Sequence, residues 1–301
     1  MNSKKLALVA LLTSSLGAFG CGDDSAPVDC TTGTTYQYVI STLTVPTSLS
    51  PDDVAGFDLD GFAGGSDEGC GRDDYTNALF TDVDNQLATL RPAIEGFVAG
   101  IDINGEMASS IQNGELVLLM EVTGVDDLVD DACVGVNVYT GSILEEGVAP
   151  EPGVNGIGLA GGQTFLTRSQ TADVTVEDAI IDAGELHFQA SEFPLDIITD
   201  DLTLSLNLAN AKVRGDLTET TMELGMIGGA MTLNAVLDAV VETVARIPDL
   251  GVPINPSVIE GILNGLLDVS PDEAGICQSL SIGVGFTAVD ATFQPARNIP
   301  Q

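Results

Sequence analysis

The chain of 301 residues contains no tryptophan and only one histidine, His187. Glycosidases and carbohydrate-binding modules usually hold sugars with aromatic side chains, and aromatic residues make up only 5% of this chain. A Ser–His–Asp or Cys–His site would have to use His187. The segment 184–191 (GELHFQAS) reads as a strand in which His187 shares the polar face with Glu185 and Gln189, so exposure to solvent is predicted.

Motifs of the common enzyme classes are also missing. The sequence has no G-x-S-x-G, no HExxH and no glycine-rich phosphate loop. It has no C-x-x-C, which argues against a zinc ribbon and a thioredoxin-type site. These absences predict that the protein is not an enzyme.

Basic residues are scarce: nine Lys and Arg stand against 45 Asp and Glu, a formal net charge of −36. Nucleic acids and anionic lipid headgroups are bound by Lys and Arg surfaces, so neither is an expected partner. The charge favours divalent cations, a salty medium or a basic partner, and solubility is the simplest explanation for it. Apolar residues make up 44% of the chain, enough for a sizeable core.

The N-terminus has the pattern of a bacterial export signal. Lys4 and Lys5 precede the apolar run Leu6 to Leu12, and small and apolar residues continue to Gly20. Because Cys21 follows directly, residues 1–20 are predicted to be a lipoprotein signal peptide and Cys21 the acceptor of a diacylglycerol and palmitate-type anchor. Residues 18–20 (AFG) also resemble an A-x-A site for ordinary signal cleavage, which leaves plain secretion as an alternative. Residues 21–29 are predicted to be a flexible tether.

Four cysteines remain after Cys21, namely Cys30, Cys70, Cys133 and Cys277. Outside the inner membrane, four cysteines predict two disulfides, and the sequence leaves all three connectivities open.

Residues 30–297 are predicted to form a β-rich globular domain. β-Branched runs predict strands at 36–45, 115–124, 133–141, 172–178, 184–191, 202–218, 220–229 and 279–293. Apolar periodicity predicts helices at about 87–101, 105–112, 234–246 and 256–268. The fold class expected is a mainly β protein, an antiparallel sandwich or curved sheet with several short helices at its ends. The Gly- and Pro-rich segment 145–163 is the candidate for a subdomain boundary or a long surface loop.

Acidic residues are densest between positions 58 and 84. Asp58-Leu59-Asp60-Gly61 has the alternating carboxylates and turn glycine of calcium loops, and residues 82–85 (DVDN) form a second fragment of this type. The match to an EF-hand loop is partial, because one acidic position and the bidentate glutamate are missing. The candidate metal ligands are Asp58, Asp60, Asp67, Glu68, Asp73, Asp82 and Asp84, and the ion expected is calcium; a solvated acidic loop is the alternative. Acidic pairs such as Asp126/Asp127 and Asp130/Asp131 are expected to serve turns.

Four segments carry a resemblance to a known group of proteins: GFDLDG (56–61), DVDNQLATL (82–90), GGAMTLNAVLDAV (228–240) and CQSLSIGVGFTAV (277–289). With them, the chain resembles acidic lipoproteins of unknown function from myxobacteria and related predatory bacteria. The resemblance implies an outer-membrane or cell-surface location and no catalytic residues.

The sequence therefore predicts an exported, lipid-anchored surface protein that acts as a non-enzymatic binding or structural module stabilised by calcium. Its membrane contact would be the anchor alone. Two alternatives stay open: a secreted hydrolase that uses paired carboxylates, and a carbohydrate-binding module.

Overall fold

The computed structural model describes residues 30, 32–62, 64–65, 70, 72–97, 102–198, 203–246 and 256–295. The predicted signal peptide, Cys21 and the tether lie outside these residues. The strands are β1 (Thr34–Thr44), β2 (Leu118–Val125), β3 (Asp131–Ile143), β4 (Gln163–Thr167), β5 (Val174–Asp182), β6 (Glu185–Ile198), β7 (Thr203–Leu217), β8 (Thr221–Thr232), β9 (Val269–Pro271) and β10 (Cys277–Gln294). The helices are α1 (Gln86–Phe97), α2 (Ile103–Asn113), α3 (Leu233–Arg246) and α4 (Pro256–Asn264), with a 3₁₀ turn η1 (Val154–Gly156).

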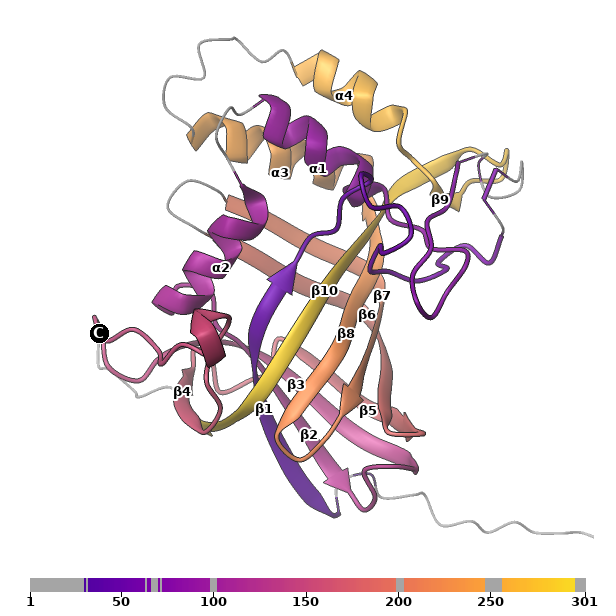
Figure 1. Ribbon diagram of the computed structural model, residues 1–301. Helices are drawn as coiled ribbons and strands as arrows, with labels where there is room; N and C mark the ends of the chain where they lie inside the picture. The colour runs from indigo at the N-terminus through magenta and orange to yellow at the C-terminus, as the bar shows by residue number, and fades with distance from the viewer. Residues whose placement is uncertain are drawn as a thin grey trace, which may run out of the picture.

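The sheet closes into an antiparallel barrel of eight strands, in the order β1, β2, β3, β5, β6, β7, β8, β10 (Figure 1). Closure comes from β10, the longest strand, which pairs with β8 along one edge and with β1 along the other. Two short strands are added to the ring: β4 runs parallel to the end of β10, and β9 pairs with its beginning.

The predicted mainly β, antiparallel class is confirmed, but the prediction of a sandwich or open curved sheet is wrong. A sandwich and a barrel both bury alternate side chains of each strand, so the hydrophobic pattern does not distinguish them. The difference lies in whether the first and last strands pair. That pairing joins Tyr38 to Asp290 and Thr44 to Gly285, residues more than 200 positions apart in sequence.

The helices and a long loop pack on part of the barrel. α1 packs on β10, α2 on β1 and α3 on β7, while α1, α3 and α4 gather at one end of the barrel (Figure 1). Residues 279–284 of β10 are all buried, so this part of the strand is covered on both faces, whereas β5 alternates between buried and exposed residues. The first described residues lie at the opposite end from the helices, where β1 begins (Figure 1).

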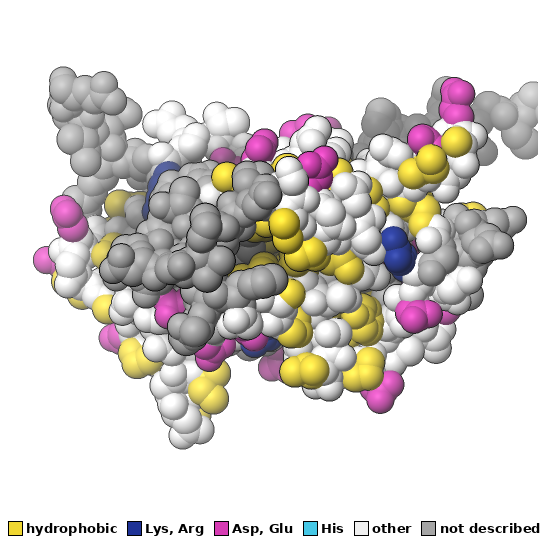
Figure 2. Space-filling model, turned by 90° about the horizontal axis from the view of Figure 1, so that it is seen from above, with side chains coloured by type: hydrophobic (Ala, Val, Ile, Leu, Met, Phe, Trp, Pro, Cys, Tyr) yellow, Lys and Arg dark blue, Asp and Glu magenta, His cyan; other side chains and the backbone are white. Residues whose placement is uncertain are grey.

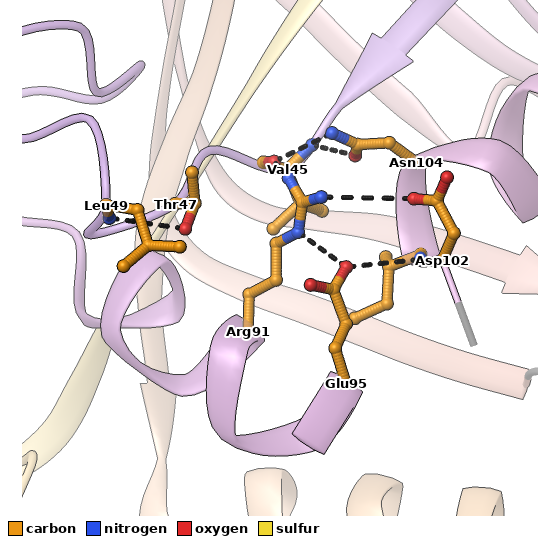
Figure 3. Close-up of polar contacts among 8 residues, drawn as sticks. Val45, Thr47, Leu49, Arg91, Glu95, Asp102 and Asn104 are labelled. Carbon is orange, nitrogen blue, oxygen red and sulfur yellow. Dashed lines mark hydrogen bonds and ion pairs between the residues drawn. The ribbon is translucent and has the colours of Figure 1, made fainter. Parts of the chain in front are cut away.

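A cluster around Arg91 joins α1, α2 and the end of β1 (Figure 3). The Arg91 guanidinium donates to the Val45 carbonyl oxygen at 2.5 Å and pairs with Glu95 at 2.8 Å. Asn104 holds the same backbone from α2, donating to the Val45 carbonyl at 3.2 Å and accepting the Val45 N–H at 2.9 Å. Because Arg91 is largely enclosed, this basic residue has a structural role, that of fixing both helices to the barrel.

The helix ends follow the sequence signals. α2 ends before Gly114, whose left-handed conformation (φ 74°) caps the helix. α4 begins with Pro256 at its first position, where the missing N–H leaves no helical hydrogen bond unmade. Pro92 lies inside α1.

Two disulfides connect distant parts of the chain. Cys30 is bonded to Cys133 at the start of β3, with Cα atoms 5.0 Å apart, and Cys70 is bonded to Cys277 at the start of β10, with Cα atoms 6.1 Å apart. The prediction of two disulfides from these four cysteines is confirmed, and the structure selects one of the three connectivities. The first bond secures the N-terminal entry to the barrel, and the second secures the acidic loop.

Glycines on β8 and β10 allow the loop 46–85 to lie directly on the sheet. A Cβ atom at Gly228 would collide with the Phe57 ring, and one at Gly283 would collide with the Ala55 carbonyl oxygen. Asn85 completes the attachment, because its side-chain amide donates to the carbonyl oxygens of Ala55 (2.6 Å) and Gly283 (2.9 Å). Close backbone packing is therefore the reason for the glycine-rich run in β8.

Candidate metal site

Three carboxylates converge where two pieces of this loop meet. An antiparallel bridge joins Phe57 to Asp84, and the Asp84 N–H donates to the Phe57 carbonyl at 3.0 Å. The bridge brings Asp84 beside Asp58 and Asp60. One carboxylate oxygen from each of the three lies within 4.8 Å of the others.

Backbone N–H groups fix the three side chains. Asp84 Oδ2 accepts from the N–H groups of Leu59 (2.7 Å) and Asp60 (3.1 Å). Asp58 Oδ1 accepts from Gly61 N–H at 2.6 Å, and Asp60 Oδ1 accepts from Phe62 N–H at 2.8 Å. The loop thus wraps around Asp84, while Gly61 adopts the positive φ (79°) that the tight turn requires.

No basic side chain among the described residues forms an ion pair with the triad. Lys212 comes close, but its Nζ donates to the backbone carbonyl of Asp58 at 2.7 Å and forms no ion pair with the three carboxylates within 4.0 Å. The acidic loop therefore concentrates negative charge against the barrel.

Burial and, to a lesser degree, mutual repulsion raise the pKa values of these carboxyl groups. Burial, together with the nearby charges of Asp60 and Asp268, raises the pKa of Asp84 to about 7, and the N–H groups of Leu59 and Asp60 oppose the rise. Burial also raises the pKa of Asp60. Asp74 has a pKa raised to about 6 by burial and by the charges of Asp60 and Asp82, and its buried Oδ2 has no hydrogen-bond partner. At neutral pH, binding of either a proton or a cation would relieve the unfavourable negative charge of these carboxylates.

Asp268 is a member of this region that sequence reasoning missed. It is 1% exposed, and its carboxylate accepts from the Ser281 N–H at 2.8 Å and from the Ser281 hydroxyl. The Ser281 Oγ in turn accepts from the N–H of Gln86 at the start of α1, at 2.9 Å. Burial raises the pKa of Asp268 to about 7, and the charge of Asp60 adds to the rise. A single aspartate after an apolar run gives no sequence signal of such a role.

The structure brings together three of the seven predicted ligands. Asp58, Asp60 and Asp84 form the triad, whereas the exposed Asp73 and the half-buried Asp82 lie outside it. Asp82 accepts the Thr81 hydroxyl at 2.9 Å. Asp67 and Glu68 lie outside the described residues.

His187 and the acidic residues of the β2–β3 turn lie outside the triad and contact other residues. His187 is partly exposed beside Glu185, with 3.3 Å between His187 Nε2 and Glu185 Oε2, and the buried Arg214 also pairs with Glu185. Asp127 and Asp131 serve the β2–β3 turn as expected, accepting the N–H groups of Val129 and Asp126 at 2.8 Å each.

Comparisons of the chain with protein-family models, with curated proteins and with solved structures find no match. Among the described residues, no helix is long and apolar enough to span a membrane.

Proposed function

We propose that the protein is an exported, lipid-anchored envelope protein, a non-enzymatic binding or structural module whose acidic loop is ordered by calcium. The observation that carries the proposal is the convergence of Asp58, Asp60 and Asp84, with which no basic side chain in the described part of the chain forms an ion pair. Calcium is the expected ion because it takes six to eight oxygen ligands in flexible geometry, and carboxylates on a loop suit it better than they suit the stricter octahedron of magnesium.

The position of the triad explains what calcium would contribute. The loop that carries it also packs on β8 and β10 and is bonded to β10 through Cys70 and Cys277. A cation between the carboxylates would remove their mutual repulsion and hold the two halves of the loop together. Calcium would then stabilise the covered end of the barrel.

The export of the protein is supported by the signal pattern before Cys21 and by the two disulfides, which persist in oxidising compartments. Cys21 precedes Cys30 by nine positions, a chain length that spans at most about 30 Å. Since Cys30 is fixed to the start of β3, an anchor at Cys21 would hold the helix-free end of the barrel near an outer membrane or cell-surface bilayer.

The hydrolase alternative receives less support. It predicts a concave site with two carboxyls between aromatic walls. A cleft of about 710 Å³ is lined by residues 173–178 and 189–192, none of which is aromatic. His187 does not line it either.

Thermal unfolding tests the calcium proposal. With millimolar calcium replacing EDTA, the melting temperature is expected to rise by about 3 to 10 °C, the range for a site with the affinity of extracellular calcium modules. Asp84→Asn and the double variant Asp58→Asn/Asp60→Asn should lose this rise. Asp53→Asn, an exposed change in the same loop, should keep it. A wild-type protein whose melting temperature is the same in EDTA and calcium would disprove the proposal.

Metabolic labelling tests the anchor. When the chain is expressed in a bacterial host with an alkyne-bearing palmitate analogue, it should become labelled. Its intact mass should be that of the lipidated chain without residues 1–20. Cys21→Ala should abolish the label. An unlabelled protein with a free N-terminal residue other than Cys21 would instead show plain secretion.

A further inference from the structure

β5 and β6 pair only near their connecting turn, and beyond it the barrel wall opens between them. The two strands are joined by the tight turn Ala183–Gly184, with φ values of 52° and 86°, typical of a two-residue hairpin. They pair over only three positions, from Ile180 with His187 to Asp182 with Glu185. Beyond these, β5 continues on β3 and β6 continues on β7, and the two strands no longer pair with each other.

A cleft of about 710 Å³ occupies the space between them, lined by residues 173–178 on one side and 189–192 on the other. Along the cleft, β5 is hydrogen-bonded only to β3 and β6 only to β7, so about half of the N–H and C=O groups of each strand face the cleft. Two strand edges that face each other in this way offer backbone hydrogen bonds to one further strand.

The edge of β6 is marked by Pro194. A proline is tolerated in a strand only where its missing N–H would not bond to the neighbouring strand. Pro194 is paired with Asn207 on β7, so its backbone nitrogen belongs to the open side. Because residues two apart on a strand share an edge, the N–H of Glu192 also faces the open side.

The cleft is acidic. Asp173, Glu177, Asp178 and Glu192 line it, and no Lys, Arg or His does. The Asp173 carboxylate accepts the Thr140 N–H at 2.6 Å, while the other three acidic side chains are exposed and have no hydrogen-bond or ion-pair partner among the residues that the structure describes. A second copy of this chain, with a net charge of −36, would be repelled from such an edge, whereas a basic segment would be attracted.

We propose that the β5–β6 cleft binds an extended, lysine- or arginine-bearing segment of a partner protein, which adds as a strand between β5 and β6. The backbone of the segment would bond to both edges, and its basic side chains would meet Glu177, Asp178 and Glu192. This mode of recognition draws affinity from the main chain and selectivity from the alternate side chains. It is independent of the metal site, which lies on a different part of the chain.

Fluorescence anisotropy with the full chain in detergent tests the proposal. The probe is a labelled peptide of about eight residues in which lysine alternates with valine and threonine, a length typical of strands. It is expected to bind. A peptide of the same sequence with N-methyl groups at alternate positions should bind about tenfold more weakly, because it cannot donate to a strand edge. A version with glutamate in place of lysine should not bind.

Paired variants locate the site. Glu177→Gln/Asp178→Asn/Glu192→Gln should weaken binding by about tenfold. Glu145→Gln/Glu146→Gln/Glu151→Gln, which removes the same charge from an exposed loop, should leave it unchanged. Glu192→Pro should weaken binding more than Glu192→Gln, because it also removes an edge N–H. The circular dichroism of each variant is compared with wild type to confirm folding.

Three results would overturn the proposal. Equal binding of the N-methylated peptide would show that only general charge attraction operates. Equal effects of the cleft and loop variants would place the binding elsewhere. The absence of any binding by the lysine peptide at its solubility limit would remove the site altogether.

Discussion

Asp84 is 3% exposed, yet its carboxylate lies within a few ångströms of two others. An ionised group in such a place is stabilised by the two backbone N–H donors and destabilised by burial and by like charge. Burial and repulsion win, since the pKa of Asp84 is raised to about 7. At the scale of single residues, the molecule therefore holds a carboxyl that titrates near neutral pH.

The free energy of unfolding should depend on pH because of Asp84. The pKa of Asp84 is raised in the folded protein relative to the unfolded value of about 3.9, so the folded state binds more protons between the two values. Its contribution to stability is present below about pH 4 and is lost as the pH rises to about 7. Without calcium, the free energy of unfolding should fall over this window, and Asp84→Asn should make the fall shallower.

Urea unfolding in EDTA at several pH values between 4 and 8 measures this effect. Asp53→Asn serves as the control and should follow the wild-type curve. If Asp84→Asn has the same pH dependence as wild type, the carboxyl does not titrate as the structure indicates.

The sequence identified all three residues of the triad but not that they belong together. Asp58 and Asp60 share a D-x-D-G fragment, and Asp84 lies in a second fragment 24 positions after Asp60. Their meeting depends on the isolated bridge between Phe57 and Asp84, which is too short to leave a periodic pattern. The carboxylate of Asp268 is held by Ser281 of β10, and no local spacing in the sequence reveals that it lies near the triad.

At the scale of elements, local patterns located the longer strands and the four helices, because alternation and capping act over a few neighbouring residues. β4 and β9 were missed. They contain five and three residues, too few for a periodicity to be recognised, and they form by pairing with longer strands: β4 with β3 and β10, and β9 with β10.

The disulfide between Cys70 and Cys277 gives an element-scale prediction. Cys70→Ser/Cys277→Ser should lower the free energy of unfolding by about 2–5 kcal/mol, the usual loss for a native disulfide. It should also free the acidic loop, so that limited proteolysis cuts between positions 46 and 85. Urea unfolding and mass spectrometry of the fragments measure the two effects.

The other disulfide supplies the control. Cys30→Ser/Cys133→Ser should also reduce stability, but the loop 46–85 should stay resistant to the protease, because that bond fixes a different end of the barrel. Equal protease sensitivity of both double variants would mean that the loop is held by general stability and not by its own bond.

At the scale of the whole molecule, closure of the barrel could not be predicted, because it depends on the meeting of the first and last strands.

The end of the barrel that the helices cover has both apolar and acidic side chains on its surface. Seen from above in Figure 2, apolar side chains gather near the centre of this face and acidic ones lie mostly toward its rim. Val241, Val258 and Ile262 of α3 and α4 are among the exposed apolar side chains, at 37%, 58% and 38%.

The net charge of −36 acts on the whole molecule. It keeps copies apart and raises the local concentration of cations around the loops. Added calcium acts beyond this general screening only if the triad binds it at a defined position. A general ionic effect would be equalled by a monovalent salt of the same ionic strength.

Calorimetric titration of the EDTA-stripped full chain with calcium, at pH 7 and constant ionic strength, is the decisive test of calcium binding by the triad. We expect a saturable heat that Asp84→Asn abolishes. We also expect that the heat depends on the ionisation enthalpy of the buffer, because calcium would displace the protons held by Asp84 and its neighbours. A heat that is absent, or that is the same for wild type and Asp84→Asn, would contradict the calcium proposal.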